Sequence, residues 1–437
     1  MSETARKPVL FAAMGLMIIM VGMLQSWNLA FALVNLCLIS AIMTLGVNIQ
    51  WGYAGLVNFG MMGFTALGGI SAVIISMPPV HDAIAAGGGG IALAVLVAII
   101  TTALAVIAWR RLAKQGRKRI IITAGITLIG AVCFRLVLDP AVAAIEAVEP
   151  AKTGYLGGFG LPIMLSWIVG ALVAAAVAWM IGKVALGLRS DYLAIATLGI
   201  SEIIIYMLKN EDWFSRGVKN VSGLPRPVPY EVELQQAEWF IGWSARLGLN
   251  VTDASTLMVK GLYAIIFILI LAAVYWLSET ALKSPWGRMM RAIRDNEVSA
   301  NAMGKDVTSR HLQVFILGSA LVGLAGAMLT TLDGQFTPAS YQPLRFTFLI
   351  WVMVIVGGSG NNAGAILGGF LIWFFWIEAE PIGLWLINML TLGMADDSWL
   401  KMHLLKNAAH TRLMTMGLVL LLVLRFAPRG LIPEEKR

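Results

Sequence analysis

Long apolar runs dominate this chain and restrict its fold more than any other feature. Twelve of them follow one another, at 9–24, 29–47, 53–76, 91–109, 120–138, 161–182, 191–208, 257–282, 311–332, 346–358, 364–378 and 412–426. A hydrocarbon layer about 30 Å thick needs about 20 helical residues to cross it. Because 59% of the residues are hydrophobic and only 13% are charged, we predict an all-α fold, a polytopic membrane helix bundle of about 10–12 spans. It would form a single membrane-embedded domain over 1–437.

Some of these runs are short and rich in glycine. The runs 53–76, 346–358 and 364–378 fall below or near the length of a full span and contain closely spaced glycines. Such segments are typical of broken or re-entrant helices. Gly364 and Gly368 also form a small-xxx-small pair, which lets two helices approach closely.

The distribution of basic residues predicts the topology. Lys and Arg concentrate in both tails and in 110–119, 183–190 and 283–310, and are sparser in the longer connections between them. By the positive-inside rule, the N- and C-termini are then cytoplasmic, and 283–310 is a cytoplasmic loop. The segments 209–256 and 379–411 become outside loops.

The outside loop 209–256 contains a predicted amphipathic helix around Glu233–Leu247. Trp239, Phe240 and Trp243 lie on it. Two interpretations stay open: the helix lies in the membrane interface, or it docks an external partner.

The charged stretch 284–310 is the most informative interruption. Ser284 suits an N-cap, Pro285 the first helical position and Gly304 a helix end. Two faces follow at helical spacing, an apolar one with Trp286, Met289 and Ile293 and a charged one with Arg288, Arg291 and Asp295. The stretch is either a solvated loop whose arginines fix topology, or a helix whose polar face binds a partner.

Glu202 is an acidic residue deep inside the run 191–208. A carboxylate near the middle of a bilayer costs about 2.5–3.5 kcal/mol on insertion scales, which the surrounding aliphatic residues offset. We expect its side chain to face the bundle interior. It would be a structural hydrogen-bond partner or part of a translocation path.

Asn58 and the glycine break at Gly357, Gly358 and Gly360 are the other candidates for a translocation path. Irregular backbone inside a membrane is tolerated where it is packed in protein or lines a cavity. Close helix packing and exposure of backbone groups to a substrate are both compatible with these residues.

Several classes of chemistry lack their motifs. The chain has no P-loop, no nucleophile elbow and no HExxH, and its one G-x-G-x-x-A match, at 358–363, lies between membrane-like runs rather than in a β-α-β unit. Cys37 and Cys133 fall in apolar runs and are predicted to be packing residues. We therefore expect no enzyme activity, no metal site, no cofactor and no nucleic-acid partner.

The chain resembles the larger, M-type permease subunit of branched-chain amino acid ABC importers, from about Ala30 to Leu431. The resemblance rests on several stretches together: GYAGLVNFG at 52–60, DYLAIATLGISEII at 191–204, NVSGLPRP at 220–227, SPWGRMMRAIRDNEVSANAMG at 284–304, IVGGSGNNAGAILG at 355–368 and RFAPRGLI at 425–432. In such permeases a cytoplasmic coupling helix rests on the ATPase subunit. Here that implies 284–310, with ATPase-coupling roles for Arg288, Arg291, Arg294, Glu297, Ala300 and Gly304. Glu297 and Gly304 are seven positions apart instead of the family's six.

The resemblance also implies a function and partners. These are ATP-driven import of leucine, isoleucine, valine or related amino acids by alternating access, in a bacterial inner (cytoplasmic) membrane. The partners would be a second homologous permease, two ATP-binding subunits, a periplasmic substrate-binding protein and membrane lipid. The alternatives are a urea or short-chain amide permease, and a stand-alone ion-coupled secondary transporter, which buried acidic and basic pairs in several spans would favour.

Overall fold

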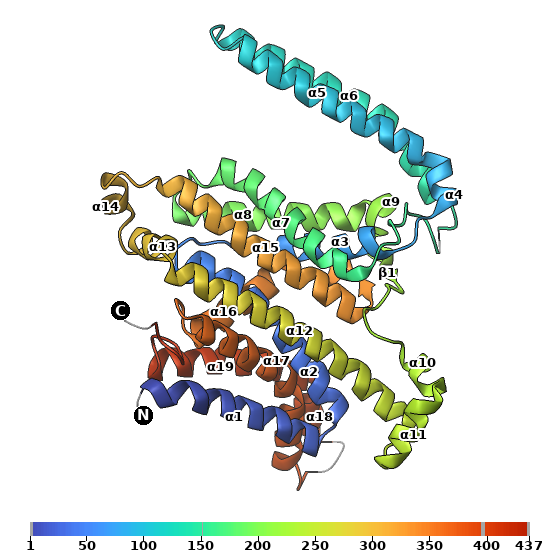
Figure 1. Cartoon of the computed structure of the whole chain (residues 1–437), viewed down its shortest axis with the longest axis vertical. Helices are drawn as coiled ribbons and strands as arrows, with labels where there is room; N and C mark the ends of the chain where they lie inside the picture. Colours follow the sequence, from blue (N-terminus) through green and yellow to red (C-terminus); the bar gives the residue numbers. More distant parts are fainter. Residues whose placement is uncertain (1–2, 151, 395–397, 435–437) are drawn as a thin grey trace.

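The protein is almost entirely helical (Figure 1) in a computed structural model that describes residues 3–150, 152–394 and 398–434. The α-helices are α1 Glu3–Leu24, α2 Trp27–Val47, α3 Met61–Ser76, α4 His81–Ala83, α5 Gly89–Arg111, α6 Arg117–Glu146, α7 Ile163–Ala185, α8 Ser190–Asn210, α9 Asp212–Ser215, α10 Glu231–Gln236, α11 Glu238–Arg246, α12 Val251–Lys283, α13 Pro285–Asp295, α14 Glu297–Ala302, α15 Val307–Asp333, α16 Pro343–Gly357, α17 Asn362–Leu390, α18 Trp399–Lys406 and α19 Thr411–Phe426. Two π-helical turns, η1 Asn48–Gly52 and η2 Ile84–Gly88, and three 3₁₀ turns, η3 Gly217–Lys219, η4 Pro338–Ser340 and η5 Ala408–His410, complete the helices. Two short strands, β1 Val221–Ser222 and β2 Gln335–Phe336, pair antiparallel.

Nine helical segments in the described residues are long and apolar enough to cross a membrane, and the bent pair α18–α19 would make a tenth. The apolar helices α3 and α16 are shorter, and irregular backbone lies before α3 and after α16. The prediction of an all-α polytopic bundle with broken segments is confirmed. The ends of both predicted tails, 1–2 and 435–437, and residues 395–397 of the predicted 379–411 loop lie outside the described residues.

The run 364–378 is a continuous candidate span, as one reading of the sequence allowed, but its predicted end at 378 is wrong. This segment is part of the 29-residue helix α17, which continues past Pro381 to Leu390. The helix continues because its charged residues have partners: Glu378 accepts a hydrogen bond from Gln25, and Glu380 pairs with Arg412 at 2.7 Å. Residues 379–390 are therefore helical rather than part of an outside loop.

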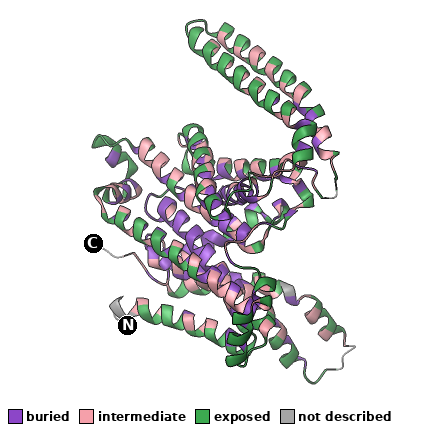
Figure 2. Cartoon of the chain, turned by 45° about the vertical axis from the view of Figure 1, so that its right-hand side comes forward, coloured by how far each residue is buried: buried purple, intermediate pink, exposed green. Residues whose placement is uncertain are grey.

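The core of the bundle is built around α15, which packs against α2, α3 and α7. Gly68 of α3, Gly170 of α7 and Gly323 of α15 meet at one crossing. A Cβ atom added at Gly170 would lie 3.2 Å from the Cα of Gly68, and one added at Gly68 would overlap the carbonyl oxygen of Gly323. These glycines let three backbones come into contact, which is how membrane helices associate when lipid competes for apolar side chains. Buried residues concentrate here (Figure 2).

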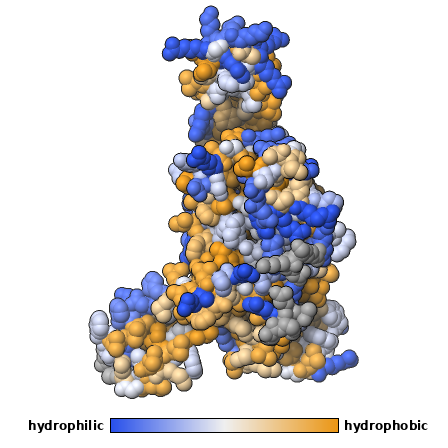
Figure 3. All heavy atoms as spheres, turned by 90° about the vertical axis from the view of Figure 1, so that its left-hand side faces the viewer, coloured by the Kyte–Doolittle hydropathy of each residue, from blue (hydrophilic) through white to orange (hydrophobic). Residues whose placement is uncertain are grey.

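The helices α5 and α6 form an antiparallel hairpin, here called the arm, that extends away from the bundle (Figure 1). Gly130 of α6 lies directly against Thr101 of α5, where an added Cβ would overlap the threonine side chain. Large aliphatic residues are exposed around both helices, and the basic tip at 110–119 is hydrophilic (Figure 3). At that tip the Arg119 guanidinium lies 3.4 Å from the centre of the Trp109 ring. Cys133, predicted to be a packing residue, is exposed on α6 because the arm has no neighbour there, whereas Cys37 is buried as predicted.

The two ends of the bundle differ. Both chain ends lie at the same end of the molecule as α13 and α14, and α9, α10 and α11 lie at the opposite end (Figure 1). Pairing of β1 with β2 joins the segment after α8 to the segment after α15 at that opposite end. The helix predicted around Glu233–Leu247 is two helices, α10 and α11, because Ala237 between them is extended. Phe240 is fully buried, while Trp239 and Trp243 are exposed.

Candidate functional site

The predicted coupling helix begins as expected but is two helices. The Ser284 hydroxyl accepts a hydrogen bond from the Trp286 backbone N–H at 3.2 Å, and Pro285 occupies the first helical position of α13. The helix stops after Asp295 because Asn296 is extended and its side chain accepts from the Ser299 N–H at 2.9 Å, which caps α14. The prediction of one continuous helix from 284 to 304 is therefore wrong.

The inner face of α13 and α14 is packed against the bundle. Met290, Ile293 and Ala300 are buried in a cluster with Ile49, Ala54, Val307 and Val314. Ala300, predicted to take part in ATPase coupling, is thus a packing residue of α14 in this chain. Gly304 is exposed after α14, with a φ of +73° that suits glycine.

The outer face of α13 and α14 is charged. Arg288, Asp295 and Glu297 are exposed, and Arg291 is half-buried and donates to the Leu282 carbonyl at 3.4 Å. A wide cleft of about 1120 Å³ opens at this surface. Five of its eleven lining residues are basic, Lys283, Arg288, Arg291, Arg294 and Arg429, and two are acidic, Asp295 and Glu434.

Arg294 points inward and links α13 to two other parts of the chain. Its guanidinium donates to the carbonyl oxygen of Gly52, at the end of the π-helical turn η1, and pairs with Glu434 at 3.0 Å. Partial burial disfavours its charge, but the hydrogen bond and negative charge of Glu434 outweigh this, and the pKa of Arg294 is raised. Arg294 is therefore positioned to hold α13 on the bundle.

The glycine break follows α16 and is covered by the segment after α19. Gly358 and Gly360 have φ angles of +119° and +79°, which favour glycine. The N–H groups of Leu431 and Ile432 donate to the carbonyls of Val356 and Gly357, each at 2.8 Å. A Cβ at Gly358 would overlap the Ile432 carbonyl oxygen. The backbone groups freed by the break are thus satisfied by Gly430–Glu434, here called the strap.

A chain of buried amides joins η1 to the glycine break. The Asn48 side chain accepts from the Gly360 N–H at 2.9 Å and donates to Asn362 at 3.0 Å; Asn362 in turn donates to Glu279 at 3.0 Å. Asn48, Asn362 and Glu279 were missed from the sequence. Asn48 and Asn362 could have been found as polar residues next to breaks in apolar runs. Asn48 begins η1, and Asn362 directly follows the glycine break.

Asn58 is buried in a second amide network, on the other side of η1. It donates to Gln50 at 3.0 Å, and its backbone carbonyl accepts from the Trp351 indole at 3.1 Å. Gln50 then donates to the Phe315 carbonyl of α15 at 2.9 Å. Asn58 therefore connects the irregular segment before α3 to α15 and α16. It makes no contact with solvent in this structure.

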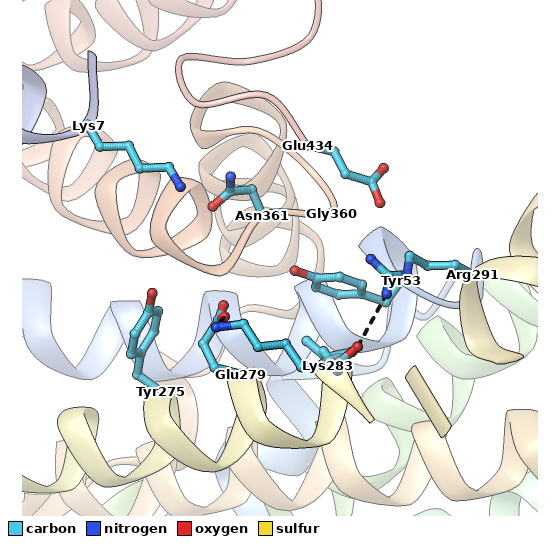
Figure 4. Close-up of a pocket in the computed structure, with 10 residues that line it drawn as sticks. Lys7, Tyr53, Tyr275, Glu279, Lys283, Arg291, Gly360, Asn361 and Glu434 are labelled. Carbon is cyan, nitrogen blue, oxygen red and sulfur yellow. Dashed lines mark hydrogen bonds and ion pairs between the residues drawn. The ribbon is translucent and has the colours of Figure 1, made fainter. Parts of the chain in front are cut away.

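These elements enclose a small polar cavity of about 190 Å³ between α12, α13, the glycine break and the strap (Figure 4). Three cationic and two acidic side chains line it: Lys7, Lys283 and Arg291, and Glu279 and Glu434. Tyr53 and Tyr275 line it as well. The structure thus brings Gly360 next to Arg291 and Arg294 of α13, which are far from it in sequence. Asn58 is linked to the same turn η1.

Glu202 lies elsewhere. It is exposed on α8, beside the exposed Ile203 and Tyr206, rather than facing the bundle interior. The expectation was wrong because hydropathy gives the depth of a residue in a span but not its direction. The buried carboxylate is instead Glu378 of α17, which is 1% exposed and bonds to Gln25 at 2.6 Å. Glu378 was missed because the predicted span ended at 378.

The chain is similar in sequence to a known protein family and to several curated proteins. The profile of the family described as branched-chain amino acid transport system permease component matches residues 141–424. The chain is 28% identical over 217 residues to the high-affinity branched-chain amino acid transport system permease protein LivM of Salmonella typhimurium, covering 49% of this chain and 50% of that protein. It is 27% identical to the probable LivM of Methanocaldococcus jannaschii, over 63% and 68% of the two chains, and 25% identical to LivH of Escherichia coli, over 49% and 64%.

The chain thus spans about half the length of the first curated relatives it matches. No solved structure matches it.

Proposed function

The chain belongs to the branched-chain amino acid transport system permease family, and on this premise we propose that it is a permease subunit of an ATP-driven importer. The cargo would be leucine, isoleucine, valine or related amino acids, moved by alternating access. The observation that carries the proposal is the family match over 141–424, which includes α13, α14, the glycine break and most of α19. ATP hydrolysis would take place on partner subunits.

The helices α13 and α14 are proposed to dock on an ATP-hydrolysing subunit. Some of their residues would contact the partner, and Arg294 would transmit movement to the bundle. The exposed Arg288 and Glu297 and the half-buried Arg291 would contact the partner. The cleft that Arg288 and Arg291 border is rich in positive charge and suits an acidic surface. Arg294 would carry movement of α13 to η1 and to the strap, because it bonds to both. Ala300 and Gly304 would shape α14 and its end.

The translocation path is proposed to include Asn58, Gly357, Gly358, Gly360 and Glu202. The first four lie in the amide networks and the break next to η1. Their hydrogen bonds would have to rearrange for a path to open between them. Glu202 would reach the path from the exposed face of α8, which we propose to face the second permease subunit. An isolated carboxylate on a lipid-facing surface is costly, and a partner removes that cost.

The remaining partners follow the same scheme. The segments 209–256 and 333–345 would lie outside the cytoplasm, where α10 and α11 would meet a periplasmic substrate-binding protein. The loop 283–310 and both termini would be cytoplasmic, in the inner membrane. Two ATP-binding subunits and one homologous permease would complete the complex, with lipid around it.

Reconstitution tests this function. The complex co-purified from native membranes would be placed in proteoliposomes and supplied with labelled leucine, with urea as the comparison substrate. We expect leucine uptake that requires ATP hydrolysis and persists when ion gradients are dissipated. Uptake that survives ATP depletion and stops with an ionophore would establish the secondary transporter instead. The Glu380–Arg412 pair is the observation that keeps that rival in the test.

A charge reversal tests the docking surface. Arg288→Glu and Arg291→Glu should each lower recovery of the ATP-binding subunits, because like charges across an interface repel. Lys114→Glu, the same charge change at the tip of the arm, is the matched control. Equal subunit recovery in all three variants would contradict the role of α13.

A further inference from the structure

An apolar cavity lies at the end of α15 that is remote from α13. Its volume is about 230 Å³, and its walls come from α2, α3, α15, α16 and α17. Eight of its fifteen lining residues are aliphatic or carry a thioether: Leu36, Ile39, Met43, Met62, Leu329, Leu349, Ile350 and Met353. This volume is below the roughly 300–1,000 Å³ of sites for drug-sized ligands, so the cavity suits a small molecule with a hydrophobic body.

Asp333 contributes the one carboxylate among the described residues that line this cavity. Asp333 ends α15, and in the described part of the chain it has no hydrogen-bond or ion-pair partner. From Val307 beside α14, the 27 residues of α15 rise about 40 Å at 1.5 Å per residue, so Asp333 lies at the opposite face of the bundle. Asp333 is exposed and also lines the cavity, so its carboxylate would attract the ammonium group of a ligand that enters there.

The lining of the cavity also includes a hydrogen-bond donor that has no acceptor in the described residues. The indole N–H of Trp373, on α17, is buried and has no hydrogen-bond partner in the described residues. The hydroxyl of Tyr341, 3.0 Å from Thr330, and the side chain of Ser340 lie on the same lining. Buried donors are nearly always paired, so an unpaired one indicates a missing acceptor.

We propose that this cavity binds a zwitterionic amino acid with a branched aliphatic side chain, within a single permease subunit. Asp333 holds the ammonium group, the indole N–H of Trp373 donates to the carboxylate, and the apolar walls surround the side chain. The cavity is then an outward-facing recognition site of the permease itself. This inference rests on the proposed transport of branched-chain amino acids and assigns residues that would select the cargo.

Equilibrium binding to the full complex in nanodiscs, without the binding protein, tests the site. The probe is tritiated L-leucine. The competitors are 3-methylbutylamine, which is leucine without its carboxylate, and 4-methylpentanoate, which is leucine without its ammonium group. We expect saturable leucine binding that the amine displaces much more effectively than the acid. Asp333→Asn should weaken leucine binding roughly 10- to 100-fold, since hydrogen bonds to charged groups contribute on that order.

Two further variants separate recognition from folding. Trp373→Phe keeps the aromatic body and should weaken binding of leucine but not of 3-methylbutylamine, which has no carboxylate. Asp253→Asn, an exposed acid near the start of α12, should leave both affinities unchanged. Equal leucine affinity of Asp333→Asn and the parent complex, or equal competition by acid and amine, overturns the proposal.

Uptake by the same parent and variant complexes in proteoliposomes, with the substrate-binding protein added, separates the binding site from the transport function. Suppose that leucine uptake is intact but the complex shows no saturable leucine binding, or that Asp333→Asn binds leucine as well as the parent does. The proposed site is then ruled out, while the transport function is retained. Absence of ATP-driven leucine uptake in the parent complex removes the transport function itself.

Discussion

The bundle around α15 and the arm formed by α5 and α6 are both apolar, but their helices differ in how many of their faces are packed against protein. In the bundle, glycines bring backbones into contact, and buried amides join the breaks between helices. In the arm, α5 and α6 pack against each other, with close contacts at Gly130 and Gly90, while their other faces are covered with exposed aliphatic residues. Hydrophobic content alone therefore does not distinguish a helix that packs in protein from one that faces lipid; small and polar residues do.

The largest expected effect comes from filling the glycine crossing of the bundle. Gly68→Leu would place a side chain on the carbonyl of Gly323, and we expect a loss of more than about 3 kcal/mol and poor recovery of folded protein. Gly125→Leu, at an open position on the arm, is the control and should be recovered at the parent level. Size-exclusion profiles and thermal unfolding in detergent measure both. Similar losses at the two positions would erase the distinction between the regions.

A smaller loss is expected where positive φ and close contact coincide. Gly358→Ala adds backbone strain and a Cβ that overlaps the Ile432 carbonyl, so it should detach the strap at a cost of about 1–3 kcal/mol. Gly116 at the arm tip has a φ of +45°, but no atom lies within 4 Å of an added Cβ. Gly116→Ala therefore introduces backbone strain without steric overlap and is the control. Thermal unfolding and protease sensitivity of the strap report the difference. A protected strap in Gly358→Ala would show that the contact is dispensable.

Replacing Arg294 should lower the stability of the protein less than the glycine substitutions do, but it should impair leucine uptake. Arg294→Gln removes the pairing with Glu434 and a charged hydrogen bond to Gly52, worth on the order of 1–3 kcal/mol. If α13 drives the bundle through this side chain, ATP hydrolysis should continue in the assembled complex while leucine uptake falls. Arg111→Gln in the arm tip is the charge-matched control. A parallel fall of hydrolysis and uptake would indicate loss of docking instead.

The smallest effect on the bundle should come from opening the arm. Gly130→Val should separate α5 from α6 locally, since the new side chain overlaps Thr101. The unfolding temperature of the bundle should stay within about a degree, because exposed faces of the arm carry no packing energy from the bundle. Cysteine cross-linking between the two helices reports the opening. A large shift in the unfolding temperature would mean that the arm is part of the core.

Local signals in the sequence predicted local structure well. Ser284 and Pro285 fixed the start of α13 because capping depends on adjacent residues. The end at Asn296 was missed, since an asparagine inside a helical pattern is equally compatible with continuation until its side chain caps the next turn.

Features that depend on distant partners were not predictable in the same way. The run was predicted to end at Glu378, with Glu380 in the outside loop. Instead, Glu378 bonds to Gln25 of the segment between α1 and α2, and Glu380 pairs with Arg412 of α19, and α17 continues. Likewise the sequence identified Arg294 and Gly360 as candidates, but only the strap residue Glu434 shows how they meet. The direction of Glu202 depends on the packing of α8, which no single run encodes.

The base of the arm has a consequence for how such a chain can change over evolution. Pro79 and Gly157 are bridged as in a short antiparallel pair, and the Val80 N–H donates to the Leu156 carbonyl at 3.1 Å. The chain therefore leaves the bundle and returns to it at one point. An insertion between ends that are already joined adds little closure cost, about 0.6 kcal/mol for each doubling of its length. This is a place where helices can be gained, lost or exchanged between relatives while the bundle that they leave keeps its shape.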